Sequence, residues 1–219
     1  MTKKLKKPWP TKAVMTQIYD MKLWGGSTFD FYSGTGSHDP KITNPHLQAV
    51  RSFLTSHKHN LVVCDLGCGD FNIGNQLVSL TKKYIAIDIV DALIERNKKR
   101  YKHNNLEFQC LDIFKDALPQ ADCLILRQVL QHVSNAEIKE IVKQLNRYKY
   151  IILTEHLPLG TFTPNKDIIS GQGIRLKKNS GVVLTAPPFH LKIKDEKIMD
   201  EYVMEANKGR IVTTLFCLH

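Results

Sequence analysis

The chain has 219 residues, of which 42% are hydrophobic and 24% are charged, the proportions of one globular domain with a full core. Its apolar runs fall well short of the roughly 18 residues that a membrane span needs, which argues against an integral membrane protein. The formal net charge of +10 favours polyanionic partners, but the basic residues form short clusters without the interleaved aromatic residues of a base-stacking surface.

The N-terminus is basic but no apolar segment follows it, so no secretory signal is predicted. The five cysteines, odd in number and mostly within predicted strands, fit buried thiols in a reducing compartment better than disulfides. Cys64 and Cys68 lack the paired spacing of a zinc site, so no metal is expected. The sequence therefore predicts a cytoplasmic protein whose residues 1–219 form a single domain.

Two helices are predicted before the first strand. Residues 11–24 have apolar side chains on one helical face, with Thr11 as the N-cap and two glycines after the helix. Asn44-Pro45 is predicted to begin the second helix, because proline is favoured at the first helical position. Residues 1–60 thus form a predicted helical cap in front of a core of residues 61–219.

The loop between these helices, residues 27–40, combines aromatic side chains with glycines and serines. Such a composition suits a lid that closes over a site, and the alternative is a surface loop with one or two rings tucked into the core. The lid hypothesis assigns substrate or lid contacts to a short set of residues, namely Trp24, Tyr32, Ser33 and Gly34.

The most informative stretch is residues 61–74, LVVCDLGCGDFNIG. An apolar run that ends in Gly67 and Gly69, followed by apolar residues at helical spacing, predicts strand, tight turn and helix. This is the opening of a nucleotide-binding βαβ unit, in which the turn lets a ligand lie against bare backbone.

Two residues argue against a nicotinamide dinucleotide as the ligand. Asn72 stands where the third glycine of that fingerprint is needed, and Asp65 would repel a pyrophosphate while attracting a ligand that carries an ammonium group. Asp88 ends the next apolar run, 19 residues after Gly69, close to the spacing at which an acid reaches ribose hydroxyls. Asp112 ends the third run.

This arrangement closely resembles a class I S-adenosylmethionine-dependent methyltransferase over residues 61–155. The resemblance implies that the glycine turn holds the methionine part of S-adenosylmethionine, that Asp88 binds the ribose and that Asp112 neighbours the adenine. Phe71 departs from the family pattern, which often has a third glycine there. The implied cofactor-binding set is Asp65, Gly67, Gly69, Asp70, Asp88, Ile89, Asp112, Ile113 and Arg127.

Alternating elements after the glycine turn predict an α/β fold with a doubly wound, mostly parallel sheet. Strands are expected at 84–88, 106–110, 122–126 and 150–154, with helices at 91–101 (Asp91 as N-cap) and from Ser134, which forms a capping box with Glu137. Residues 156–180 are predicted as loop, 181–185 as an extra strand, and 197–205 with 211–218 as a closing antiparallel hairpin. The resemblance implies that the whole is a Rossmann-like methyltransferase fold.

Methyl transfer is an in-line displacement that depends mainly on positioning, and a base is needed only if the nucleophile loses a proton. His132 is the first candidate for such a base because imidazole titrates near neutral pH, and Glu155 and His156 come next. The alternative role of His132 is a helix-start residue bonded to backbone. Arg127 either touches the cofactor or pairs with Asp70 or a substrate anion.

The predicted function is methyl transfer from S-adenosylmethionine to a small-molecule acceptor. An RNA methyltransferase is the runner-up because of the net charge, although nucleic acid is not the favoured partner. The third hypothesis is a module that binds the cofactor without catalysis, and a nicotinamide oxidoreductase is more distant. The sequence predicts neither the acceptor atom nor the oligomeric state.

Overall fold

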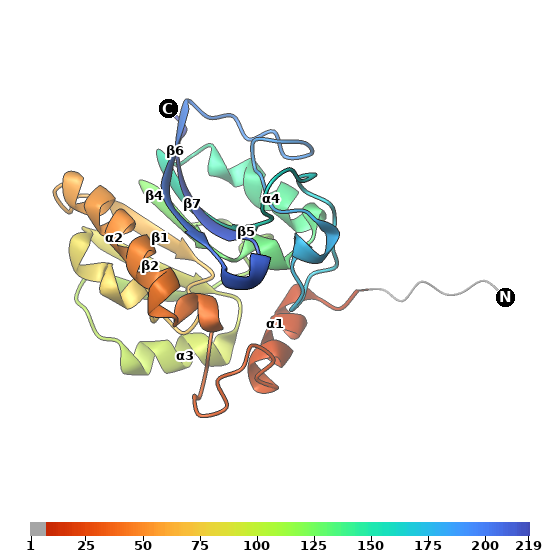
Figure 1. Cartoon of the computed structure of the whole chain (residues 1–219). Coiled ribbons are helices and arrows are strands. Elements are labelled where there is room, and N and C mark those ends of the chain that lie inside the picture. The colour runs from red at the N-terminus through yellow and green to blue at the C-terminus, as the bar shows by residue number, and fades with distance from the viewer. Residues whose placement is uncertain (1–7) are drawn as a thin grey trace.

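The computed structural model describes residues 8–219, so the lysine clusters of residues 1–7 lie outside the described part. Its centre is a seven-stranded sheet in the order β3-β2-β1-β4-β5-β7-β6 (Figure 1). The first five are parallel, and β7 runs antiparallel to both β5 and β6. The strands are β1 Val62–Leu66, β2 Lys83–Asp88, β3 Leu106–Cys110, β4 Cys123–Arg127, β5 Tyr150–Leu157, β6 Asp195–Val203 and β7 Arg210–Cys217. The predicted fold class is confirmed.

Helices cover both faces of this sheet (Figure 1). The α-helices are α1 Thr11–Asp20, α2 Pro40–Ser56, α3 Asp91–Arg100 and α4 Asn135–Leu145, and the short 3-10 turns are Thr35–Ser37, Gly74–Gln76, Val78–Leu80, Leu130–His132, Arg175–Lys178 and Glu205–Asn207. The buried side of α2 belongs to one apolar cluster, and the buried sides of α3 and α4 belong to the other. In residues 8–219 no helix is both long enough and apolar enough to cross a membrane.

The two N-terminal helices differ from their predicted bounds. Helix α1 begins at Thr11 itself, with Pro10 at the N-cap position, and ends at Asp20 rather than at residue 24. Helix α2 begins at Pro40, ahead of the predicted start, because the Asp39 side chain accepts a 2.9 Å hydrogen bond from the Lys41 amide. Asp39 and Pro40 form a stronger helix start than Asn44-Pro45, since they combine a side-chain cap with a proline in the first turn.

The segment after β1 was predicted as a helix, and it is not one. Phe71 has a φ of +64°, and two short 3-10 turns follow in place of α-helix. The predicted strand 181–185 is also absent: residues 181–183 have no regular structure, a turn follows, and the side chains of Val182 and Leu184 enter the core. Position 91 is the first residue of α3 rather than its N-cap, which is Val90. The capping box of Ser134 with Glu137 is confirmed.

Candidate functional site

A cavity of about 360 Å³ lies beyond the carboxyl ends of β1, β2 and β4, where an open parallel sheet binds its ligands. Segments from α1, the loop before α2, and the chain after β4 complete its walls. Most predicted site residues line this cavity: Trp24, Ser33, Gly34, Asp65, Gly67, Gly69, Asp70, Asp88, Ile89, Ile113, Arg127 and His132.

The glycine turn requires residues without side chains for two reasons. Gly67 and Gly69 both have left-handed backbone, with φ of +81° and +56°. A Cβ at Gly69 would also overlap the Ser33 hydroxyl. Phe71, which replaces the third glycine of the family pattern, adopts a φ of +64° and is fully buried against Phe108, Tyr84 and Tyr101. Aromatic packing thus stabilises a backbone conformation that a bulky residue rarely adopts.

Two buried carboxylates sit at the ends of β1 and β2 on the cavity wall. Asp88 accepts 3.1 Å hydrogen bonds from the amides of Gly69 and Val90, so it holds the glycine turn in place. Asp65 accepts a 2.9 Å hydrogen bond from the Tyr84 hydroxyl. Burial raises the pKa of Asp65 to about 7 and raises the pKa of Asp88. A cationic ligand would favour the charged forms of both groups.

Arg127 brings a positive charge to the same end of the cavity. Its guanidinium donates to the Gly36 carbonyl and, at 3.2 Å, to the Ser37 hydroxyl. Its Nε is buried without a hydrogen-bond partner among the described residues. Burial lowers the Arg127 pKa to about 10, so the guanidinium remains charged at neutral pH. Arg127 lines the cavity, and its Nε is a donor that no described residue accepts from.

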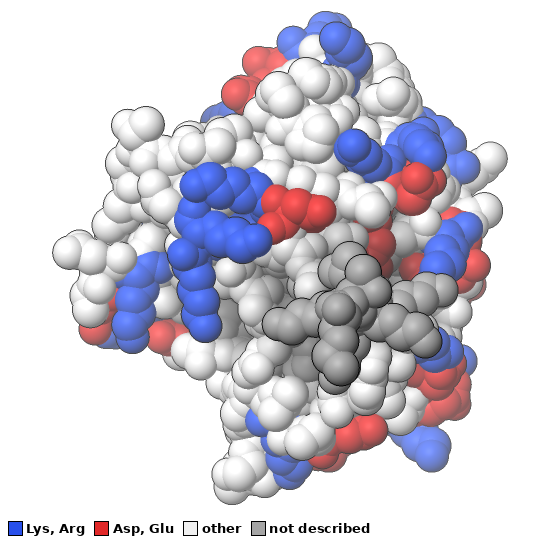
Figure 2. All heavy atoms as spheres, turned by 90° about the vertical axis from the view of Figure 1, so that its right-hand side faces the viewer, with Lys and Arg blue, Asp and Glu red and all other residues white. Residues whose placement is uncertain are grey.

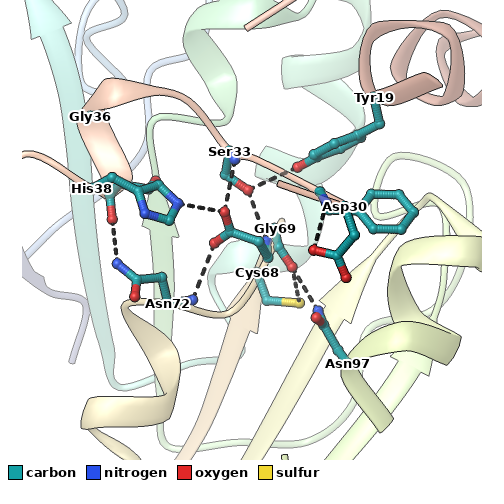
Figure 3. A network of polar contacts seen from close by, with 12 residues as sticks. Tyr19, Asp30, Ser33, Gly36, His38, Cys68, Gly69, Asn72 and Asn97 are labelled. Carbon is teal, nitrogen blue, oxygen red and sulfur yellow. Dashed lines mark hydrogen bonds and ion pairs between the residues drawn. The ribbon is translucent and has the colours of Figure 1, made fainter. Parts of the chain in front are cut away.

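The loop before α2 is fastened to the glycine turn, with Asp70 as the common acceptor. The Asp70 carboxylate accepts from the Ser33 amide at 2.8 Å and contacts His38 Nε2 at 2.6 Å. The Asp70 amide in turn donates to the Ser33 hydroxyl at 2.8 Å. Figure 3 shows Ser33 and His38 directed toward the turn that contains Gly69. The loop is therefore part of the cavity wall, and its role as a lid stays a prediction.

A second attachment lies further out on the same loop. Arg96 of α3 donates two 2.7 Å hydrogen bonds to the Asp30 carboxylate and a 3.0 Å bond to the Asp70 carbonyl. These bonds lower the pKa of Asp30 to about 2. The loop is therefore held at two places by residues that follow β1 and β2.

Apolar side chains form another part of the cavity lining, supplied by Met15, Trp24, Phe114, Val133 and Ile174. The Trp24 and His132 rings lie 5.3 Å apart between centroids. Burial lowers the pKa of His132 to about 4, so its ring is neutral at physiological pH. The charged residues that line the cavity are thus few: Asp65, Asp70, Asp88 and Arg127 come from the ends of β1, β2 and β4, and the other lining residues are uncharged.

Two predicted ligand contacts do not line the cavity. The Tyr32 ring stacks on His38 with centroids 4.4 Å apart, so it supports the loop from outside. The Asp112 carboxylate accepts from the Phe114 amide at 3.1 Å and pairs with Lys115 at 2.5 Å. Its neighbours Leu111 and Ile113 line the cavity instead. The carboxylate therefore organises the turn after β3.

Neither Glu155 nor His156 lines the cavity either. Glu155 is 2% exposed in β5, with both carboxylate oxygens unpartnered among the described residues, and burial raises its pKa to about 8. His156 Nε2 lies 2.7 Å from the carbonyl oxygen of Lys208 in the β6–β7 connection. Of the three predicted catalytic side chains, the structure brings only His132 to the cavity.

Several lining residues have no signal in the sequence. Tyr19, Gln131 and Gln172 line the cavity, yet they come from a helix, a 3-10 turn and a segment predicted as featureless loop. Gln172 is tied to the N-terminal region by a 2.6 Å bond to the Leu23 carbonyl. Only the tertiary fold brings these segments together, because Tyr19 lies more than a hundred residues before the other two, and Gln131 and Gln172 are themselves 41 residues apart.

Comparisons with known proteins agree with this geometry. Residues 57–212 match a family model described as a methyltransferase domain. Bovine acetylserotonin O-methyltransferase is 32% identical over 90 residues, 39% of this chain, and the chain spans about a quarter (26%) of that relative.

Two solved structures share the fold. One is the N-methyltransferase NodS of Bradyrhizobium japonicum WM9 with bound S-adenosyl-L-homocysteine: TM-score 0.65 and 12% identity, covering 94% of this chain and 100% of that one. The other is the magnesium protoporphyrin IX methyltransferase of Synechocystis PCC 6803 with the same compound: TM-score 0.60 and 14% identity, covering 96% and 100%.

Proposed function

Because the chain belongs to the methyltransferase-domain family, we propose that it transfers a methyl group from S-adenosylmethionine to a small, uncharged acceptor. The observation that supports this proposal is the set of residues that line one cavity. The acids beside the glycine turn suit the cationic cofactor, while the uncharged lining residues suit a neutral acceptor.

The charged lining residues and two isoleucines suit the ribose, the amino-acid part and the adenine of the cofactor. Asp88 would accept from the ribose hydroxyls, and the acids Asp65 and Asp70 would favour the ammonium and sulfonium charges. The free Nε of Arg127 suits the carboxylate of the amino-acid part. Ile89 and Ile113 would flank the adenine. When bound, the cofactor supplies a methyl group on a positively charged sulfur.

The uncharged lining residues would hold the acceptor and exclude water. Trp24 and its apolar neighbours would contact the apolar part of the acceptor. Positioning of the nucleophile and the methyl group can lower the activation barrier by several kcal/mol. His132, neutral at physiological pH, is the group in this region that can accept a proton from an acceptor hydroxyl or amine.

Calorimetry tests the cofactor first. We expect S-adenosylmethionine and S-adenosylhomocysteine to bind the wild-type chain and NAD to give no heat. Incubation with S-adenosylmethionine and a panel of uncharged hydroxyl and amine compounds, read by formation of S-adenosylhomocysteine, then tests transfer. Strong NAD binding without binding of either sulfur compound would overturn the proposal. Cofactor binding without any acceptor would instead favour a binding module.

The net charge of +10 supports RNA as the alternative acceptor. On the face seen in Figure 2, however, lysines and arginines lie in separate groups with acidic residues among them. RNA binding predicts an affinity that falls steeply with salt, because each neutralised phosphate releases counterions. A titration of single-stranded RNA at several salt concentrations distinguishes the two acceptors.

A further inference from the structure

The Gln131 side chain contacts both the backbone of β5 and the imidazole of His132 within hydrogen-bond distance. Its side chain is buried, and it lines the cavity together with His132. Gln131 Oε1 lies 3.1 Å from the backbone nitrogen of His156, and Gln131 Nε2 lies 3.2 Å from His132 Nε2. A backbone N–H can only donate, so the carboxamide oxygen must face His156, and the NH₂ group must face His132.

This orientation determines which imidazole nitrogen carries the proton. An amide NH₂ group has donors and no acceptor, so His132 Nε2 must provide its lone pair. Neutral His132 therefore carries its proton on Nδ1. That nitrogen is buried without a hydrogen-bond partner among the described residues, and the backbone of residues 171–173 adjoins the ring.

Protonation of His132 would place two donors against each other. The imidazolium has N–H at both positions, and the new Nε2–H would face the Gln131 NH₂ group. Arg175 is the charged group that acts on the ring from the described residues, and it also opposes a positive charge there. Burial is the largest effect that lowers the His132 pKa, and these two contacts act in the same direction. The backbone of residues 171–173 acts in the opposite direction, and the resting imidazole is neutral.

We propose that Gln131 is a positioning residue that fixes the Nδ1–H tautomer of His132, so that the Nε2 lone pair receives the proton of a hydroxyl or amine acceptor. The tautomer follows from contacts within this chain, whereas the role in transfer rests on the proposed function. In that step the acceptor first displaces the Gln131 amide from the Nε2 lone pair. The acceptor–hydrogen bond then breaks and the proton passes to Nε2, while a bond from the acceptor to the methyl carbon forms and the carbon–sulfur bond breaks.

The tautomer can be measured without activity. Long-range proton–nitrogen correlation spectra of the ¹⁵N-histidine-labelled chain should show His132 protonated at Nδ1 and bare at Nε2. Gln131→Glu presents an acceptor to the same nitrogen, so we expect the proton to appear on Nε2 and the His132 pKa to rise by about 1 to 3 units. Gln131→Met removes both bonds and should give a mixture of tautomers.

Gln172→Glu is the matched control, because it places the same charge change on another lining residue whose amide bonds the Leu23 carbonyl. We expect it to leave His132 in the Nδ1–H form. Nε2–H in the wild-type chain, or an unchanged tautomer in both Gln131 variants, would overturn the proposal. Because the spectra need no cofactor, a chain with the expected tautomer that fails to bind S-adenosylmethionine would contradict only the proposed function.

Discussion

Asp88 holds the glycine turn and lines the cavity, whereas Asp112 does not line it. Substitutions of these two acids, both predicted to contact the cofactor, should therefore weaken cofactor binding to different degrees. Asp88→Asn leaves a side chain of the same size but removes a charged acceptor, and we expect about 10- to 100-fold weaker binding of S-adenosylmethionine. Asp112→Asn should weaken binding much less, because that carboxylate bonds Phe114 and Lys115. Calorimetry of both variants compares them directly, and equal losses would show that Asp112 also reaches the ligand.

Glu155 is a buried acid without a hydrogen-bond partner among the described residues, and its effect on stability depends on pH. Its folded-state pKa is raised from 4.5 to about 8, so the folded chain holds a proton that the unfolded chain releases above pH 4.5. The contribution to unfolding free energy is complete below pH 4.5 and is lost as pH rises through about 8. We expect Glu155→Gln to reduce the decrease in the free energy of unfolding between pH 5 and 8, as measured by urea unfolding. Parallel wild-type and variant curves would contradict a buried proton on Glu155.

At the scale of elements, the loop before α2 forms part of the cavity wall, and the sequence predicts that it acts as a lid. Asp70→Asn removes the charged acceptor of the Ser33 amide and of His38, and we expect faster hydrogen exchange in residues 27–39. Asp30→Asn should have a smaller effect, since its carboxylate is 54% exposed and such pairs contribute about 0–1 kcal/mol. Lys143→Ala breaks a pair on the far helix α4 and serves as the control. Unchanged exchange in Asp70→Asn would contradict this anchoring role.

How far the elements could be predicted depends on whether their signals are local. The five parallel strands and the closing hairpin follow from apolar runs and their turns, and the Ser134 capping box lies within four residues. The segment after Gly69 has helical spacing at Ile73, Leu77 and Leu80, yet it forms 3-10 turns. The site was predictable where it belongs to β1 and β2. Gln172 was missed because its neighbours in the cavity are distant in sequence.

For the whole molecule, one ligand would join elements from opposite ends of the chain. The cavity wall includes α1, the glycine turn, the chain after β4 and residues 172–174, so a cofactor bound there stabilises the native state as a unit. At 100 times its dissociation constant, S-adenosylhomocysteine should add about 2.7 kcal/mol to the free energy of unfolding. For a chain of this size that corresponds to a rise in Tm of roughly 5–10 °C, growing with the logarithm of ligand concentration. Differential scanning calorimetry measures this shift. Asp88→Asn is the control, since its curve should move to higher ligand concentration, and a wild-type Tm independent of ligand would contradict binding at this cavity.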